Sequence, residues 1–321
     1  MKVLVTGSTG FVGRYLCSHL VERGYSVRAS LRSLASADFD SRLESVFIDN
    51  IGPDTFWDEA LSGQDAIIHL AGRAHTADSQ DQDATNLFES TNVEGTEKLA
   101  LSAIKNNIKK FIFLSSVKAA GETSTNFALN EAMNPMPEDL YGKTKLRAEK
   151  LLLDLSFGTE METIIIRAPL IYGPGVKGNF LNLMTVCGRG LPLPFKSINN
   201  KRSFLFLGNL ADACEKLLKV KNISEEVFFI SDGTSVSTAD LTEKISSSLG
   251  TKPRLFSIPT IILVLVGKLL GKSLNINRLT GSLEVDDSKF KRMLGWTPPF
   301  NMLQGLKVTA KWFHDNLKLQ K

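Results

Sequence analysis

The first thirteen residues carry the feature that most limits what this chain can fold into. The run VLVTGSTGFVG (residues 3–13) places Gly7, Gly10 and Gly13 between an apolar β-rich stretch and a stretch with the spacing of an amphipathic helix. In such a unit the first glycine permits a tight turn, the second lets the backbone approach a pyrophosphate, and the third lets helix and strand pack closely. The helix N-terminus offers N–H groups to the anion. The stretch therefore predicts a dinucleotide-binding turn.

Short β-rich runs alternate with helical periodicity through the first half of the chain, which is typical of a parallel sheet. We expect strands at residues 3–5, 26–31, 46–48, 65–71, 111–115 and 163–167, and one more at 227–230. Helices are expected from about residue 10, over 86–106, from 141, and after a capping box at 237–240. We therefore predict an α/β fold: a Rossmann doubly wound parallel sheet in residues 1–168 and a smaller C-terminal substrate-binding lobe in residues 169–321. The strand near 227–230 is expected to return from that lobe to the sheet.

Composition and charge restrict the class of protein. The chain is 43% hydrophobic and 22% charged, which is ordinary for a globular protein, and its formal charge of +4 looks spread along the chain. We therefore expect no nucleic-acid partner, since such a partner requires a clustered basic stripe. Cys17, Cys187 and Cys214 have neither metal-ligand nor disulfide spacing. Together with the absence of a signal peptide at the N-terminus, this leads us to expect a cytoplasmic protein with reduced cysteines.

One apolar stretch, residues 258–270, resembles a membrane segment. It is too short to span a bilayer and is interrupted by Gly267 and Lys268. We expect a buried or partly exposed helix of the C-terminal lobe, with a surface helix that rests on a membrane as the alternative.

The end of the second expected strand indicates which cofactor would bind. An acidic residue about 20 residues beyond the glycines holds the ribose 2′-hydroxyl of NAD. Here the strand ends in Leu31 and Arg32 instead. A guanidinium can bind a 2′-phosphate bidentately. The sequence therefore favours NADP over NAD, with a plain surface arginine as the alternative for Arg32.

Four residues form a candidate catalytic group. Tyr141 and Lys145 are four residues apart at the start of an expected helix and so lie on one face. A lysine ammonium there would lower the pKa of the phenol, which could then exchange a proton near neutral pH. Ser115 and Ser116 end a buried strand, and a serine hydroxyl could hydrogen-bond the same substrate oxygen. The pattern indicates hydride transfer at an alcohol or ketone.

Together these motifs resemble the extended short-chain dehydrogenase/reductases, the NAD-dependent epimerase/dehydratase family. The GxxGxxG spacing, HLAG at 69–72, NVEGT at 92–96 and RAPLIYGPG at 167–175 carry the resemblance, which covers essentially the whole chain. It implies that Ser116, Tyr141 and Lys145 are catalytic. It also implies a set of cofactor contacts: Gly7, Thr9, Gly10, Phe11, Val12, Gly13, Arg32, Asp49, Asn50, Leu70, Ala71, Gly72, Asn92, Ser115, Tyr141, Lys145 and Pro169.

The resemblance further implies a UDP-sugar substrate and pairing of two copies through a four-helix bundle. Arg202 would clamp the diphosphate, and Arg278 would be a second clamp or a solvated surface charge. The implied substrate contacts are His75, Ser116, Lys118, Asn179, Leu193, Arg202 and Arg278.

Within the family, the chain is similar to bacterial enzymes of surface-polysaccharide (O-antigen) synthesis, namely UDP-glucose 4-epimerases and UDP-N-acetylquinovosamine dehydrogenases. The latter reduce a 4-keto-6-deoxy sugar. Leu170 replaces an asparagine of many epimerases, and Leu31 with Arg32 replaces the acid that holds NAD. A reductase must exchange its cofactor, whereas an epimerase retains NAD, so we expect a 4-keto reductase. The alternatives are a 4-epimerase, a dehydratase, and a non-catalytic NADP(H)-binding regulator.

Overall fold

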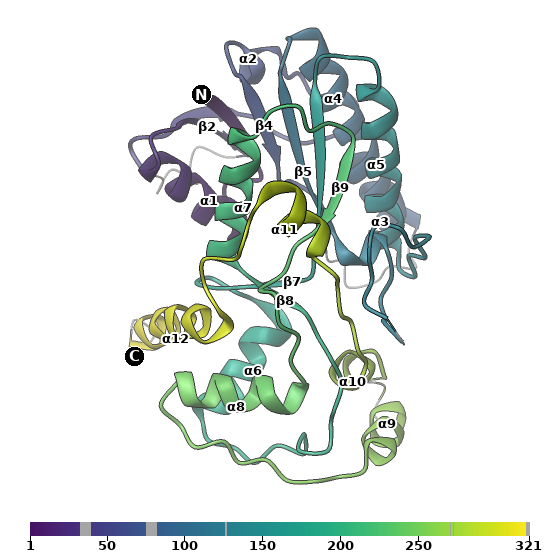
Figure 1. Cartoon of the computed structure of the whole chain (residues 1–321), viewed down its shortest axis with the longest axis vertical. Helices are drawn as coiled ribbons and strands as arrows, with labels where there is room; N and C mark the ends of the chain where they lie inside the picture. The colour runs from purple at the N-terminus through teal and green to yellow at the C-terminus, as the bar shows by residue number, and fades with distance from the viewer. Residues whose placement is uncertain (33–39, 75–81, 126, 270, 272, 319–321) are drawn as a thin grey trace.

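A seven-stranded sheet forms the centre of the protein, as the sequence predicts (Figure 1). In this computed structural model, residues 1–32, 40–74, 82–125, 127–269, 271 and 273–318 are described. The strand order is β3-β2-β1-β4-β5-β6-β9, and every neighbouring pair is parallel. The strands are β1 (Lys2–Thr6), β2 (Ser26–Leu31), β3 (Glu44–Phe47), β4 (Ala66–His69), β5 (Lys110–Ser116), β6 (Glu162–Ala168) and β9 (Glu226–Phe229).

Helices cover both faces of the sheet, so alternate strand residues enter two separate cores. Val3 and Val5 of β1 join the core beneath α1 (Phe11–Glu22) and α7 (Leu207–Lys219). Leu4, between them, joins the core beneath α4 (Gly95–Lys105) and α5 (Leu140–Ser156). Burial on both faces explains why the strands read as continuous apolar runs in the sequence. The strand order reverses between β1 and β4, which is where open α/β sheets bind ligands.

The helix expected over 86–106 is interrupted. It consists of α3 (Gln82–Phe88), a π-helical turn at Glu89–Glu94 and α4. A β-carbon on Gly95 would lie 2.7 Å from Cγ2 of Ile51, so the chain passes close to the segment after β3 at this point. The π-turn contains Asn92, and such turns occur frequently at functional sites.

The C-terminal lobe is built on a two-stranded parallel sheet of β7 (Leu170–Tyr172) and β8 (Phe204–Phe206). Tyr172, Phe180 and Phe206 lie in its apolar core. Around them pack α6 (Gly178–Gly188), α8 (Thr238–Ser248) and α12 (Met302–Lys318), while α9 (Thr260–Leu269) and α10 (Ser273–Thr280) lie at the outer edge (Figure 1). The predicted capping box is present, with Ser237 and Asp240 bonding each other's backbone at the start of α8.

Three elements that follow β7 in the chain contribute to the core of the large sheet. β9 returns to the sheet as the sequence predicts, and there it pairs with β6, with Ile165 opposite Val227. The helices α7 and α11 (Ser288–Leu294) were not predicted, yet Leu210, Leu217 and Phe290 pack in the same core as α1. The chain therefore crosses between the lobes more than once. Among the described helices, none has the length and apolarity needed to cross a membrane.

The glycine turn has the geometry that the motif predicts at two of its glycines. Gly7 has a φ of +67°, and a β-carbon there would lie 2.8 Å from the backbone nitrogen of Ala71 after β4. A β-carbon on Gly13 would lie 2.2 Å from the carbonyl oxygen of Gly7, which no side chain can tolerate. Gly13 thus sets how closely α1 packs on β1.

We expect Gly13→Ala to lower the free energy of unfolding by about 3 kcal/mol, because the added methyl group meets backbone that cannot move without displacing α1. Denaturant titration measures this. Gly188→Ala is the matched control: its β-carbon would first meet Cε1 of Phe313 at 3.4 Å, an ordinary contact, and its effect should stay within about 1 kcal/mol. Equal effects of the two substitutions would contradict the packing argument.

Candidate active site

A cavity of about 960 Å³ opens at the carboxyl ends of β1, β2 and β4, where the strand order reverses. The N-terminus of α1 begins at this turn after Gly10, and no side-chain cap bond is formed there by the described residues. An uncapped helix N-terminus beside a cavity fits a bound anion, and the volume suits a dinucleotide. The predicted cofactor residues that line the cavity are Gly7, Thr9, Gly10, Arg32, Asp49, Asn50, Leu70, Ala71 and Gly72.

The remaining predicted cofactor residues lie around this cavity or beyond it. Phe11 and Val12 form the first turn of α1, and Pro169 is buried between β6 and β7. The cavity also contains residues that the sequence analysis did not select. The segment after β3 supplies several of them, including Phe56, whose side chain is exposed. Its sequence matches no motif, so only the fold brings it here.

A buried histidine joins the cofactor turn to the π-turn. Nδ1 of His69 lies 2.6 Å from the hydroxyl of Thr6, which also accepts from Ala71 N at 3.3 Å. Nε2 lies 3.1 Å from the hydroxyl of Thr96, which in turn donates to the carbonyl of Asn92 at 2.8 Å. Every donor in this series of hydrogen bonds has an acceptor when the neutral His69 ring carries its proton on Nε2. Burial and nearby Lys145 lower the pKa of His69 to about 3, so the ring is neutral at physiological pH.

Asn92 connects the cavity to α5, the helix that carries Tyr141 and Lys145. Its Oδ1 accepts from Arg73 N at 2.8 Å, and its Nδ2 donates to Arg73 O at 3.0 Å and to the hydroxyl of Thr144 at 3.2 Å. The segment after β4 is thereby held against α5. A β-carbon on Gly72 would lie 3.1 Å from Oδ1 of Asn92 and 3.3 Å from Nζ of Lys145. The edge of the cavity therefore reaches the predicted catalytic lysine.

The start of α5 is fixed to the end of β5. Asp139 caps the helix by accepting from Gly142 N at 2.7 Å. A β-carbon on Gly142 would lie 2.4 Å from the carbonyl oxygen of Lys118, so the YGKTK sequence needs its glycine for this close approach. Tyr141 and Ser116 come together in this way, close enough for the Ser116 side chain to lower the pKa of the Tyr141 phenol. The structure thus unites two of the predicted catalytic residues.

The pKa values at the site differ from the sequence-based expectation. Burial raises the pKa of Tyr141 to about 12, and this outweighs the lowering by its hydrogen bond with Ser116. The expected lowering by Lys145 is therefore not seen in the free protein. Nζ of Lys145 donates to the carbonyl of Leu114 at 2.9 Å and lies 4.3 Å from the ring centroid of Phe113. Burial lowers the pKa of this lysine to about 8.

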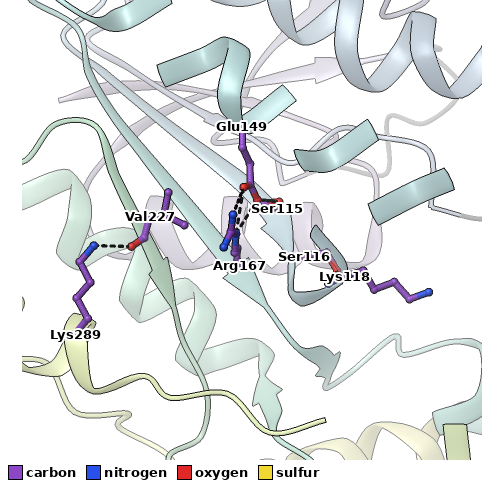
Figure 2. Close-up of polar contacts among 7 residues, drawn as sticks. All are labelled: Ser115, Ser116, Lys118, Glu149, Arg167, Val227 and Lys289. Atoms are coloured by element: carbon purple, nitrogen blue, oxygen red, sulfur yellow. Dashed lines mark hydrogen bonds and ion pairs between the residues drawn. The ribbon is translucent and has the colours of Figure 1, made fainter. Parts of the chain in front are cut away.

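A buried ion pair that the sequence analysis missed lies behind these residues (Figure 2). Glu149, four residues after Lys145 on α5, accepts from Nη2 of Arg167 at 2.6 Å and from its Nε at 3.1 Å. Ser115 is opposite Arg167 in the β5–β6 register and donates its hydroxyl to Glu149. Both charged side chains are almost fully buried. The spacing Tyr141, Lys145, Glu149 was the available signal, because it continues the same helical face.

Ser115 and Ser116 therefore have different hydrogen-bond partners. The hydroxyl of Ser115 donates to Glu149 of the Glu149–Arg167 pair, whereas the hydroxyl of Ser116 accepts from Lys118 N at 3.2 Å (Figure 2). The choice of Ser116 as the catalytic serine stays a prediction, which the engagement of Ser115 with Glu149 supports.

One more predicted substrate contact, Lys118, lies beside Ser116. Lys118 forms ion pairs with Asp139 and, at 3.1 Å, with Glu122, so its ammonium is held at the N-terminus of α5. His75 lies outside the described residues.

The C-terminal lobe brings two predicted substrate arginines together. Nη1 of Arg202 donates to the carbonyl of Arg278 at 2.8 Å. Burial and the neighbouring Arg278 guanidinium lower the pKa of Arg202. Two adjacent guanidiniums would suit a diphosphate. Leu193 pairs through its backbone with Arg254 and Phe256, and Asn179 is exposed in the first turn of α6.

Comparison with known proteins agrees with the fold and the motifs. The model of the NAD dependent epimerase/dehydratase family matches residues 3–230. A UDP-glucose 4-epimerase of Vibrio cholerae is 38% identical over 97% of this chain and 95% of its own length. An N-acetyl-alpha-D-glucosaminyl-diphospho-ditrans,octacis-undecaprenol 4-epimerase of Escherichia coli O157:H7 is 26% identical over the same shares. The crystal structure of a UDP-glucuronic acid 4-epimerase from Bacillus cereus with UDP-glucuronic acid and NAD is 23% identical. It superposes with a TM-score of 0.79 over 98% of this chain and 100% of that one, which shows a shared fold.

We expect Glu149→Gln to lower the free energy of unfolding by about 3 kcal/mol, because the charge of Arg167 would remain buried without its partner. Denaturant titration near neutral pH measures the loss. Glu160→Gln is the matched control, since that carboxylate pairs with Lys109 in solvent and its removal should cost less than about 1 kcal/mol.

Adding Arg167→Met to Glu149→Gln should recover part of the loss by removing the uncompensated charge. If Glu149→Gln and Glu160→Gln have the same effect, the buried pair has no special role in stability.

Proposed function

This chain belongs to the NAD dependent epimerase/dehydratase family, and on that premise we propose that it is an NAD(P)-dependent UDP-sugar 4-epimerase. The observation that carries the proposal is the Ser116–Tyr141 pair, with Lys145 four residues further along α5, at the edge of the cofactor-sized cavity. The relative of 38% identity, which is named a UDP-glucose 4-epimerase, supports 4-epimerisation rather than the reduction that the sequence analysis favoured.

In this proposal the residues of α5 and β5 move the proton. Bound nicotinamide supplies a hydride acceptor and donor. Oη of Tyr141 takes the proton of the sugar 4-hydroxyl as that carbon is oxidised, and returns it when hydride is delivered to the opposite face. Ser116 hydrogen-bonds the same oxygen and Tyr141, which favours the phenolate. Lys145 stays buried beside Gly72, where it can hold the nicotinamide ribose. Proton and hydride are both returned, so the cofactor is unchanged after each turnover.

Arginines of the C-terminal lobe would select the substrate class. Arg202 and Arg278 are the groups we assign to the diphosphate of a nucleotide sugar. The name of the Escherichia coli relative describes a sugar joined to a lipid through a diphosphate. A nucleotide sugar and a lipid-linked sugar of that kind share the diphosphate group. The identity of the sugar depends on a few contacts in the lobe.

Tyr141→Phe should abolish epimerisation of UDP-glucose and UDP-N-acetylglucosamine, with a loss of about 10²–10⁴-fold in kcat, because no group then carries the proton. Product analysis by NMR measures turnover, and NAD(P) affinity should stay near that of the unaltered protein. Tyr25→Phe is the matched control, since Tyr25 lies at the amino ends of the strands, away from the site. Full activity of the Tyr141→Phe variant would contradict the assignment of Tyr141 as the group that exchanges the proton.

A second candidate function, reduction of a UDP-4-keto-6-deoxy sugar, is favoured by one observation. Arg32 lines the cofactor cavity and Leu31 occupies the place of the acid that would hold NAD. A reductase would consume NAD(P)H in stoichiometric amounts with a 4-keto sugar. An epimerase would interconvert UDP-hexoses with no net change in the absorbance of reduced nicotinamide.

Arg32→Ala should weaken NADP binding about tenfold or more and leave NAD binding nearly unchanged, because only the 2′-phosphate would contact the guanidinium. Calorimetric titration with both cofactors measures this. Arg23→Ala, an exposed arginine at the opposite end of the sheet, is the control and should change neither affinity. If Arg32→Ala changes neither affinity, Arg32 is a solvated surface residue.

A further inference from the structure

The helix α9 exposes an apolar face to solvent. At 3.6 residues per turn, Ile261, Leu265 and Leu269 follow one another along one face, with Ile262 and Val264 on either side. The exposed fractions of Ile261, Leu265 and Leu269 are 69%, 55% and 86%. A surface helix of a globular protein normally turns its apolar stripe inward. Here the stripe faces outward, and a contiguous patch of this kind marks an interaction surface.

The opposite face of α9 packs against α10. A β-carbon on Gly267 would lie 2.4 Å from Cγ1 of Ile276, so α9 and α10 approach closely there. Leu263, on the same side, is only partly exposed. The outward face is therefore not needed for packing against α10. In Figure 1, α9 lies at the outer edge of the C-terminal lobe, where a large flat surface could reach it.

The stretch of sequence that contains this helix is basic. Residues 244–283 contain no aspartate or glutamate, so this stretch has a formal charge of +6 and the rest of the chain has −2. The even spread expected in the sequence analysis is therefore wrong. Lys268 lies on the exposed face of α9 itself, where its long side chain can extend from an apolar layer to the headgroups. The basic residues of the stretch are Lys244, Lys252, Arg254, Lys268, Lys272 and Arg278.

We propose that α9 docks on an anionic lipid bilayer, with its apolar face in the interfacial layer and the surrounding basic residues against lipid headgroups. Apolar area together with basic charge is what binds helices to anionic membranes. A second copy of this chain is the less suitable occupant, because pairing through α9 would bring two surfaces of positive charge together.

The docking surface is joined to the substrate side of the molecule. Arg278, in α10 next to α9, is bonded through its carbonyl to Arg202. Docking would therefore place the arginines assigned to the substrate diphosphate close to the membrane surface. The proposal does not depend on the reaction that the enzyme catalyses.

Flotation of the full-length protein with vesicles tests the proposal. Vesicles of phosphatidylcholine mixed with phosphatidylglycerol should bind the protein about tenfold or more tightly than phosphatidylcholine alone. The binding should weaken with salt, because the screening length falls from about 10 Å at 0.1 M to about 3 Å at 1 M. The double variant Ile261→Asp, Leu265→Asp should lower the affinity for the mixed vesicles about tenfold or more.

Phe157→Asp is the matched control, because Phe157 is 75% exposed after α5 in the other lobe, and it should bind like the unaltered protein. Circular dichroism and thermal unfolding should be the same for all variants, since the substituted side chains are exposed. The proposal is overturned if the mixed vesicles do not bind the protein or if the double variant binds as well. It is also overturned if sedimentation shows a dimer that the double variant dissociates while no vesicles bind, because the face would then belong to a second copy.

Discussion

The position of the whole site follows from one close contact, that of Gly13 in α1 with the carbonyl of Gly7 after β1. Because no side chain separates the two, α1 begins directly at the carboxyl end of β1 with its N-terminus toward the cavity. Gly7 itself packs on the backbone of Ala71, so the neighbouring strand ends at the same place. The cofactor turn and the turn after β4 are thus a single packed unit.

From this unit, buried polar side chains extend toward α5. His69 is bonded on both nitrogens, and Asn92 is bonded to both the segment after β4 and to Thr144 of α5. Behind α5, the Glu149–Arg167 pair ties the helix to two strands. In a low-dielectric interior such bonds are strong when complete and costly when one partner is removed. They therefore hold in place the residues that we propose to exchange the proton.

The C-terminal lobe has two features that its own packing does not explain. It brings the backbone of α10 onto Arg202 and leaves α9 with an apolar, basic face toward solvent. A structure stabilised only by its own core would not retain this face, because it costs solubility without improving packing. The two contacts that we propose, a substrate diphosphate on one side and a membrane on the other, would account for both features of the lobe.

The sequence by itself determined the parallel sheet, the glycine turn and the residues of the YGKTK motif, since these depend on local periodicity and on short spacings along the chain. It missed α7 and α11 in the sheet's core, the π-turn around Asn92, and the role of Glu149, because each depends on segments far apart in sequence. The pKa of Tyr141 is a tertiary property as well: spacing places Lys145 nearby, but burial decides the direction of the shift. Likewise, composition shows that residues 258–270 are apolar, and only the packing of α9 on α10 decides which face is left exposed.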